Sequence, residues 1–317
     1  MDKLYLVIPC YNEEEVLPET VRRLTHKLES LIAQGAAAPA SRMLLVDDGS
    51  RDRTWSMIEE YHRQNPLVLG LKLTRNRGHQ NALLAGLMTA KDLADVTISL
   101  DADLQDDTDA IDAFLEQYRE GFDIVYGVRN NRDTDTAFKR GTAQAFYRLM
   151  SLLGADTVYN HADYRLMSRR ALEGLSQFRE VNLFLRGMVP MVGYPAATVE
   201  YRRGERFAGT SKYPLTKMLN FALDGVTSLS VRPIRFITLA GALLAGAGLL
   251  WGLVLLVLAL AGRAGLGTAA LLQGIWTACG LQLLATGVIG EYLGKIYLEA
   301  KDRPRFLIEA FLGDDPV

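Results

Sequence analysis

The chain has 317 residues, 49% of them apolar, with 35 basic and 37 acidic side chains and a formal net charge of −2. This balance excludes a broad positive field that would attract nucleic acid, so no nucleic-acid partner is expected. Two cysteines, Cys10 and Cys279, are too few for a disulfide framework and favour a reducing compartment. The apolar stretch at the N-terminus is too short for a signal peptide.

Apolar runs and amphipathic segments alternate through the first 130 residues. The apolar runs predict strands at Leu4–Ile8, Met43–Val46, Val68–Leu73, Val96–Leu100 and Asp123–Tyr126. The segments between them predict helices at Glu13–Leu31, Thr54–Arg63, Gln80–Ala90 and Asp109–Arg119. Strict alternation of this kind predicts an α/β fold, with a mostly parallel sheet and helices on both of its faces.

Two uncharged runs dominate the C-terminal third. Phe236–Leu260 would form a helix about 37 Å long, enough to cross a hydrocarbon core of about 30 Å, and Thr268–Gly290 is a second such run. We expect two transmembrane helices, and a buried helical hairpin is the alternative for a soluble protein. Basic residues flank the pair on its outer sides, so the positive-inside rule places both ends in the cytoplasm.

Two further segments, Lys139–Leu153 and Lys212–Val231, are amphipathic. Both are compatible with helices in the membrane interface, although packing on the sheet is an equal alternative for the first. The chain thus divides into a catalytic domain at 1–205, a loop and interfacial helix at 206–234, a two-helix membrane domain at 235–294 and a tail at 295–317.

An acidic cluster, Asp-Ala-Asp-Leu-Gln-Asp at 101–106, directly follows the predicted strand at Val96–Leu100. In open α/β sheets, ligands bind beyond the carboxyl ends of the strands. The oxygen-bearing side chains of Asp101, Asp103 and Gln105 could hold a hard cation, which commonly brings phosphates with it. An isolated Asp-x-Asp is weak evidence, because acidic loops are common.

Two other strand ends carry motifs, Pro-Cys-Tyr-Asn-Glu-Glu at 9–14 and Asp-Asp-Gly-Ser at 47–50. The Gly-x-Gly-x-x-Gly and P-loop patterns are both missing, so a glycine-rich phosphate cradle is not expected. Asp48 could accept hydrogen bonds from a nucleoside. A turn with a helix N-cap is the alternative for the second motif.

Taken together and in this order, the three motifs resemble those of family 2 glycosyltransferases of the GT-A fold. Four further segments extend the resemblance, at 75–83, 163–169, 182–184 and 206–213. With the two apolar helices they resemble polyprenyl-phosphate glycosyltransferases, most closely the bacterial undecaprenyl-phosphate (bactoprenol) glucosyltransferases. Dolichyl-phosphate mannose synthases are wider relatives in this resemblance.

The resemblance implies a donor site at the strand ends. The residues that would hold the donor nucleoside are Pro9, Tyr11, Glu13 and Asp48. Asp101 and Ala102 would lie beside its diphosphate, and Asp103 and Gln105 would be the ligands of Mg²⁺ or Mn²⁺.

The resemblance also implies roles near the acceptor. Arg129 would lie near phosphate, Arg206 and Lys212 would clamp phosphate close to the membrane, and Asp163 stands where a catalytic base is often proposed. Simpler alternatives are an ion pair of Asp163 with Arg165 or Arg169, a solvated charge at Arg129 and ordinary interfacial decoration at Lys212. His79 and His161 lack metal-ligand spacing and are assigned no chemistry.

The expected activity is inverting transfer of one hexose from a nucleotide sugar to polyprenyl phosphate at the cytoplasmic face of the inner membrane. UDP-glucose is the preferred donor, and UDP-N-acetylglucosamine, UDP-galactose and GDP-mannose are alternatives. Family analogy suggests a homo-oligomer such as a tetramer. Two other classes are a processive polysaccharide synthase, whose Gln-x-x-Arg-Trp motif is missing here, and a non-enzymatic scaffold or flippase.

Overall fold

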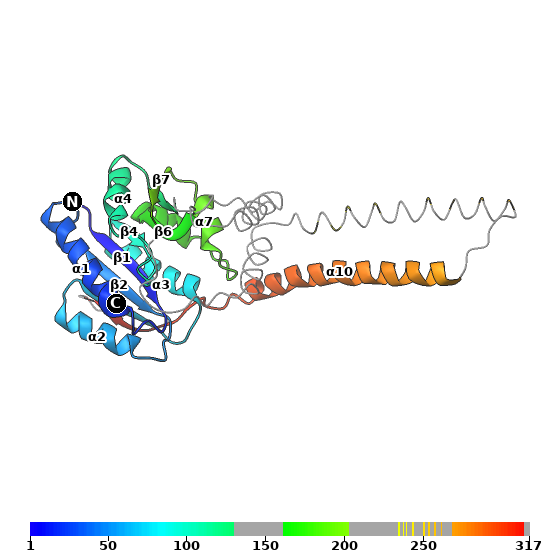
Figure 1. Ribbon diagram of the computed structural model, residues 1–317, viewed down its shortest axis with the longest axis horizontal. Coiled ribbons are helices and arrows are strands. Elements are labelled where there is room, and N and C mark those ends of the chain that lie inside the picture. The colour runs from blue at the N-terminus through cyan, green and yellow to red at the C-terminus, as the bar shows by residue number, and fades with distance from the viewer. Residues whose placement is uncertain are drawn as a thin grey trace.

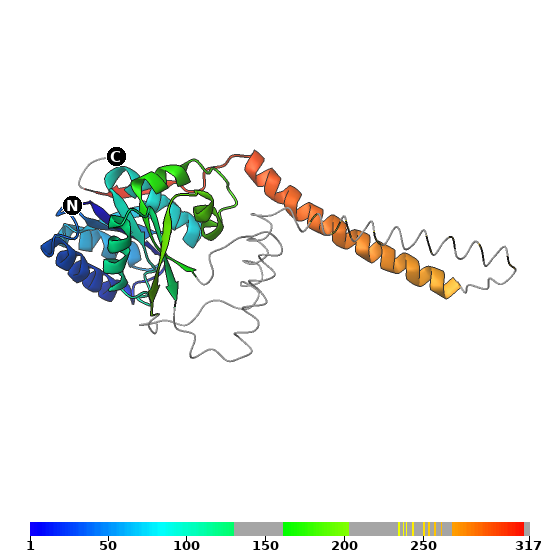
Figure 2. The same ribbon diagram turned by 90° about the horizontal axis from the view of Figure 1, so that it is seen from above.

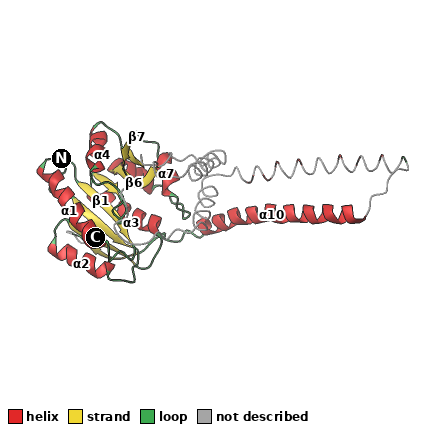
Figure 3. Ribbon diagram, in the orientation of Figure 1, coloured by secondary structure: helices red, strands yellow, loops and turns green. Residues whose placement is uncertain are grey.

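The computed structural model describes residues 1–129, 161–202 and 268–313, together with single positions between 234 and 261. These residues form a mixed eight-stranded sheet with helices packed on it, and one long helix extends away from this domain (Figure 1). The α/β class predicted from the sequence is confirmed. Figure 3 shows the alternation of helices and strands that underlies it.

Strands and helices alternate through the first 129 residues, as the apolar pattern predicts. The elements are β1 (Leu4–Cys10), α1 (Leu17–Ala33), β2 (Arg42–Asp47), α2 (Thr54–Gln64), β3 (Val68–Leu73), α3 (His79–Leu93), β4 (Val96–Ser99), α4 (Ala110–Arg119) and β5 (Ile124–Arg129). The later described elements are β6 (His161–Ser168), α6 (Arg169–Ser176), α7 (Leu185–Met191), β7 (Ala196–Tyr201), α10 (Thr268–Ala300) and β8 (Ile308–Leu312).

The strand order is β7-β5-β6-β4-β1-β2-β3-β8. Strands β1 to β4 are mutually parallel, whereas β6 pairs antiparallel with both β4 and β5, and β8 pairs antiparallel with β3. The predicted parallel sheet is therefore correct for its first four strands and incomplete beyond them. Because β6 runs opposite to β4, its first residues lie at the edge where β4 ends.

Each face of the sheet has its own apolar core. Helices α1, α2 and α4 cover one face with side chains that include Leu24, Ile58 and Phe114, and α3, α6 and α7 cover the other. Helix α3 approaches its face closely, since a Cβ on Gly86 would lie 2.5 Å from Val7 Cγ1 and 2.7 Å from Val46 Cγ2. This close packing fixes where α3 begins relative to the strand ends.

The last described part of the chain is a long helix followed by an edge strand of the sheet. Helix α10 begins far from the sheet and ends beside it, and the chain that follows places β8 beside β3 (Figure 2). The second apolar run of the sequence is thus helical, and the segment predicted as a tail includes a strand of the sheet. Within the described part of the chain, no helix combines the length and apolar character that crossing a bilayer requires.

Several predicted segments lie outside the described residues. They are both amphipathic segments, at 139–153 and 212–231, and almost all of the first apolar run at 236–260.

Candidate active site

The three sequence motifs meet at one edge of the sheet. Strand β1 lies between β2 and β4, and all three are parallel, so the loops that follow them leave the same edge. The start of β6 joins them there, because the Ser99 hydroxyl at the end of β4 donates to the backbone oxygen of Asp163 at 2.6 Å. The sequence prediction that these segments form one site is consistent with this geometry.

The loops after β1 and β2 are bonded to each other. The Asn12 N–H donates to Ser50 Oγ at 3.0 Å, and Asn12 Oδ1 accepts from the Arg51 N–H at 2.8 Å. Asn12 has a φ of 53°, in the left-handed region that asparagine tolerates better than most residues. The Glu13 N–H donates to Thr54 Oγ1 at 2.9 Å, while Tyr11 remains exposed beside these bonds.

Asp48 is buried and organises the loop that leads into α3. Its carboxylate oxygens accept the N–H groups of Arg77 at 2.7 Å and Gly78 at 2.9 Å. Burial raises the pKa of Asp48, and these two backbone hydrogen bonds oppose the rise. The Asp48 side chain therefore holds this loop in place. A contact of Asp48 with a nucleoside stays a prediction.

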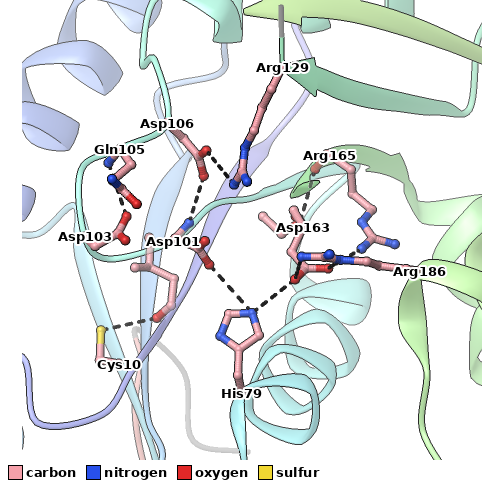
Figure 4. Close-up of polar contacts among 12 residues, drawn as sticks. Cys10, His79, Asp101, Asp103, Gln105, Asp106, Arg129, Asp163, Arg165 and Arg186 are labelled. Atoms are coloured by element: carbon pink, nitrogen blue, oxygen red, sulfur yellow. Dashed lines mark hydrogen bonds and ion pairs between the residues drawn. The ribbon is translucent and has the colours of Figure 1, made fainter. Parts of the chain in front are cut away.

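Hydrogen bonds to its own side chains shape the acidic loop after β4. The Gln105 N–H donates to Asp103 Oδ1 at 3.2 Å, and the Asp101 N–H donates to Asp106 Oδ2 at 3.3 Å. Leu104, between them, has a left-handed φ of 57°. The turn brings the Asp103 and Gln105 side chains next to each other, as Figure 4 shows.

An imidazole lies between two carboxylates at the centre of the site. His79 Nε2, at the start of α3, is 3.6 Å from Asp101 Oδ1 and 3.6 Å from Asp163 Oδ2 (Figure 4). Burial would lower the pKa of His79, but Asp163 and Asp101 raise it to about 9. The imidazole is therefore a cation at neutral pH, and it links the acidic loop to β6.

Asp163 has two further cationic partners. Its Oδ1 is 2.9 Å from Arg165 Nη2, and its two oxygens accept Arg186 Nε and Nη2 at 3.2 and 3.0 Å. Although burial alone would raise the pKa of Asp163, Arg186, His79 and Arg165 hold it well below its usual range. The ion pair with Arg165 considered in the sequence analysis is present, whereas Arg169 pairs with Asp95 at 3.0 Å.

Arg129, at the end of β5, faces the acidic loop from the other side. Its Nε donates to the Tyr201 hydroxyl at 3.1 Å, and that hydroxyl donates to Asp106 Oδ1 at 2.7 Å. Burial and the charge of Asp101 raise the pKa of Asp106 to about 6, while Tyr201 and Arg129 act against this rise. The guanidinium is thereby held next to the carboxylates, and a place for Arg129 near phosphate stays a prediction.

The sequence profile described as Glycosyl transferase family 2 matches residues 5–176, which is more than half of the chain. The match includes His79, the acidic loop and Asp163, whereas Arg186 and Tyr201 lie beyond it. The chain belongs to glycosyl transferase family 2. The resemblance drawn from the motifs is thus confirmed at the level of the family, and this protein is a glycosyltransferase.

Relatives align over almost the whole length of this glycosyltransferase. The "Uncharacterized glycosyltransferase YkoT" of Bacillus subtilis (strain 168) is 53% identical over 98% of this chain and 93% of that protein. The "SfII prophage-derived bactoprenol glucosyl transferase" of Shigella flexneri is 38% identical over 97% of each.

Among solved structures, the mannosyltransferase PcManGT from Pyrobaculum calidifontis, in complex with GDP-Man and Mn²⁺, aligns with a TM-score of 0.44. The alignment has 19% identity and covers 95% of this chain and 87% of that chain. A TM-score and an identity this low assign neither ligand nor reaction to this glycosyltransferase.

Four side chains of the site carry no assignment from the sequence. His79 gave no spacing signal, and Arg186 lies just beyond the Asn-Leu-Phe segment at 182–184. Asp106 closes the acidic motif without having been given a role, and Tyr201 ends a strand that the sequence did not predict. Arg206 and Lys212, which the sequence analysis did assign, lie outside the described residues.

The donor set at the acidic loop suits a hard divalent cation. Within residues 1–129, 161–202 and 268–313, no group of three or more His, Cys, Asp or Glu side chains converges as a complete metal site. Mg²⁺ commonly needs only one or two protein carboxylates, because substrate phosphates and water complete its shell. Asp103 offers one carboxylate, and the amide oxygen of Gln105 is a second oxygen ligand beside it.

Proposed function

We propose that this glycosyltransferase transfers a single glucose from UDP-glucose to polyprenyl phosphate, with inversion at the anomeric carbon. The observation that carries the proposal is the 38% identity to a protein named a bactoprenol glucosyl transferase over 97% of both chains. An alignment of this extent includes the apolar C-terminal third as well as the sheet domain. It therefore favours a lipid-linked acceptor over a soluble one.

The donor would lie across the strand ends. Its nucleoside would rest on the bonded loops after β1 and β2, against Pro9, Tyr11, Glu13 and Asp48, with its diphosphate beside Asp101 and Ala102. Tyr11 is exposed and can contact a nucleoside directly. Asp48 is buried and would support the nucleoside site indirectly, by holding the backbone N–H groups of residues 77 and 78 in place.

Mg²⁺ or Mn²⁺ would be held by Asp103 and Gln105, where it would neutralise the departing diphosphate. Acidic side chains gather at this loop: burial and the neighbouring Asp163 and Asp103 raise the pKa of Asp101, while His79 and Arg129 act against this rise. A divalent cation would relieve the repulsion among these acidic side chains. The protein oxygens alone leave room in the coordination shell for phosphate oxygens.

Asp163 is better suited to orientation than to general-base catalysis. Its pKa is held well below the usual range, so it is a weak proton acceptor. The acceptor does not require a strong base, because a phosphate monoester has a second pKa of about 6 and is largely dianionic at neutral pH. A lipid phosphate oxygen would attack the anomeric carbon as the nucleoside diphosphate leaves, and Asp163 would keep His79 and Arg186 in place.

Two anionic substrates must approach each other in this reaction. Arg129, at the end of β5, is held by the Tyr201 hydroxyl and would screen the repulsion between the two substrates. We propose the same role for Arg206 and Lys212 nearer the lipid. Electrostatic groups fixed before the reaction stabilise developing charge more effectively than mobile water does.

We propose that the runs at 236–260 and 268–290 anchor a GT-A catalytic domain, 1–205, at the cytoplasmic face of the inner membrane. The segment at 206–234 would lie in the interface. A homo-oligomer stays a prediction from family analogy.

Transfer to an extractable lipid tests the proposal. The purified protein would be offered undecaprenyl phosphate with UDP-glucose, UDP-N-acetylglucosamine, UDP-galactose or GDP-mannose, and the product would be identified by mass. We expect one hexose on the lipid, from UDP-glucose. A polymer would indicate a processive synthase, and nucleotide binding without turnover would indicate a scaffold or flippase.

The metal site has its own test in Asp103→Ala. We expect transfer to fall at least about 100-fold, because a preorganised charge facing the leaving group is lost. Membrane association should be unchanged. Asp109→Ala, which alters an exposed carboxylate just beyond the same loop, is the matched control and should retain activity. Unchanged turnover of Asp103→Ala at saturating metal would remove the cation-site assignment.

A further inference from the structure

One carboxylate near the end of α10 receives three hydrogen bonds from the catalytic domain. Glu299 Oε2 accepts the Val181 N–H at 2.8 Å, and Oε1 accepts the Asn182 N–H at 2.8 Å and Asn182 Nδ2 at 2.7 Å. Asn182 Nδ2 also lies 3.4 Å from the backbone oxygen of Lys295, one turn earlier on α10. Hydrogen bonds to an ionised acceptor are roughly twice as strong as those between neutral groups.

The segment bound by Glu299 leads directly to the active site. Phe184 and Leu185 follow in buried positions, and the Leu185 N–H donates at 2.8 Å to Oε1 of Gln80, the neighbour of His79. The next residue is Arg186, whose guanidinium binds both oxygens of Asp163. Only three residues separate Asn182 from Arg186.

Hydrogen bonds join α10 to this segment beside a hollow. A cavity of about 610 Å³ lies between them, with Phe178 and Arg179 on one side and Tyr292 and Ile296 on the other. One further contact spans the junction, from Arg305 Nη1 to the backbone oxygen of Phe178 at 3.0 Å. Glu299 therefore supplies most of the hydrogen bonds described between α10 and the 181–186 segment.

We propose that Glu299 is a positioning residue, which holds the 181–186 segment so that the Arg186 guanidinium stays on Asp163. This inference rests on the proposed function only where activity is the readout. It makes the end of α10 part of the support of the active site, although Glu299 itself contacts neither the acidic loop nor His79. A shift of about 1 Å in a positioned group can reduce the rate of an enzyme about 100-fold.

The principal variant is Glu299→Gln. The amide retains one accepting oxygen but places an NH₂ group against the N–H groups of Val181 and Asn182, so at least one of them loses its partner. We expect kcat to fall about tenfold while KM for UDP-glucose changes less than about twofold, because the group displaced acts at the reacting centre. Glu291→Gln, at an exposed position on the same helix, is the matched control and should keep both constants.

Hydrogen–deuterium exchange gives a readout that requires no activity. In Glu299→Gln, peptides that cover 181–186 should exchange faster than in the wild type, while peptides from α3 should be unchanged. If the wild type transfers no glucose, the proposed function fails, but the exchange result still decides the role of Glu299. Unchanged exchange at 181–186 overturns the inference.

A double-mutant cycle separates positioning from general stabilisation. If Glu299 acts through Arg186, then Glu299→Gln should reduce kcat much less in an Arg186→Gln background than in the wild type. Fully additive losses would overturn the inference. If Glu299→Gln fails to fold, Asn182→Ala is the second variant, because it removes only the side-chain donor to Glu299. We expect it to give a smaller loss of kcat than Glu299→Gln and faster exchange at 181–186. No change in kcat or in exchange would overturn the inference.

Discussion

At the scale of single residues, the site is built around one carboxylate, Asp163, that pairs with several cationic side chains. Asp163 is 13% exposed at its side chain and Arg165 is 1% exposed, so their ion pair is largely shielded from water. Arg186 and His79 complete the surroundings of the carboxylate. A buried arginine needs such a partner, because an unpaired buried charge is costly.

Replacing this carboxylate should therefore cost stability as well as activity. For Asp163→Asn we expect a loss of about 3 kcal/mol in the free energy of unfolding, since the Arg165 charge remains buried without an anion. Asp95→Asn is the matched control, because its ion pair with Arg169 is 44% and 45% exposed and should contribute less than about 1 kcal/mol. Urea unfolding followed by tryptophan fluorescence measures both, and equal losses would contradict the argument.

The charge on His79 predicts a dependence of stability on pH. Its pKa is raised from 6.5 to about 9 in the folded protein, so its stabilising contribution is complete below pH 6.5 and is lost as pH rises through about 9. Between pH 7 and 10, the melting temperature of the wild type should fall more steeply than that of His79→Gln. His26→Gln, at an exposed position on α1, should follow the wild type. If the melting temperatures of the wild type and His79→Gln fell in parallel with pH, the ion pairs of His79 would not be the cause of the pH dependence.

The sequence pointed to some site residues and missed others for a physical reason. Asp101 and Asp103 follow a strongly apolar strand, so their place at the sheet edge could be predicted. His79 could not be found in this way, because a lone histidine carries no spacing signal and its partners lie far from it in the sequence. Its role depends on α3 and β6 meeting at the end of β4.

At the scale of the elements, the loops after β2 and β3 approach each other closely at Gly49. This residue has a φ of +66°, and a Cβ there would lie 2.5 Å from the Asn76 backbone nitrogen. Glycine is therefore required in the Asp-Asp-Gly-Ser motif on two grounds, conformation and space. The motif turns the chain, as its alternative interpretation expected, but it does not supply the expected helix N-cap, since the N-cap of α2 is Arg53. The turn holds Asp48 under the loop at 77–78.

Gly49→Ala should consequently destabilise the protein by roughly 3 kcal/mol, from left-handed strain together with overlap with the backbone. Gly35→Ala separates the two causes. Gly35 has a similar φ of +70°, but its Cβ would meet only the flexible end of Met1 at 3.1 Å. We expect about 1 kcal/mol for this control, measured by the same urea unfolding. Similar losses at both positions would show that the close approach is not rigid.

The elements that were predicted share a simple pattern, and those that were missed do not. Strands β1 to β4 are apolar runs between amphipathic helices, and β3 was predicted with its observed bounds, Val68–Leu73. Strand β6 contains Asp163 and Arg165, whose charges suggest a loop until their pairing is known. Strand β8 is a five-residue edge strand beyond a long helix, so no local pattern shows where it pairs.

At the scale of the whole molecule, the chain after α10 completes the catalytic sheet. Strand β8 covers the outer edge of β3, and Lys72 Nζ donates to Glu309 Oε1 at 2.8 Å across the pair. Together with Glu299 and Arg305, this strand joins the end of α10 to the sheet domain. The end of α10 and the strand after it are therefore structurally continuous with the sheet that carries the active site.

Removing residues 306–317 should expose the edge of β3, which then offers unpaired backbone groups to other chains. We expect the melting temperature to fall by about 5 °C or more and the protein to aggregate on size-exclusion chromatography. Removing only 314–317, beyond β8, is the control and should leave both measurements unchanged. A stable, monodisperse product of the longer deletion would show that β8 is dispensable to the sheet.

Because β8 lies near the C-terminal end of the sequence, it is synthesised long after the strand with which it pairs. Its partner residues Lys72 and Glu309 are 237 positions apart. At a synthesis rate of about 5–20 residues per second, β3 leaves the ribosome roughly 10–50 s before the strand that covers it exists. During that interval the nascent chain presents an open strand edge while its apolar C-terminal runs are still being synthesised, so a chaperone or the translocation machinery has a defined surface to shield.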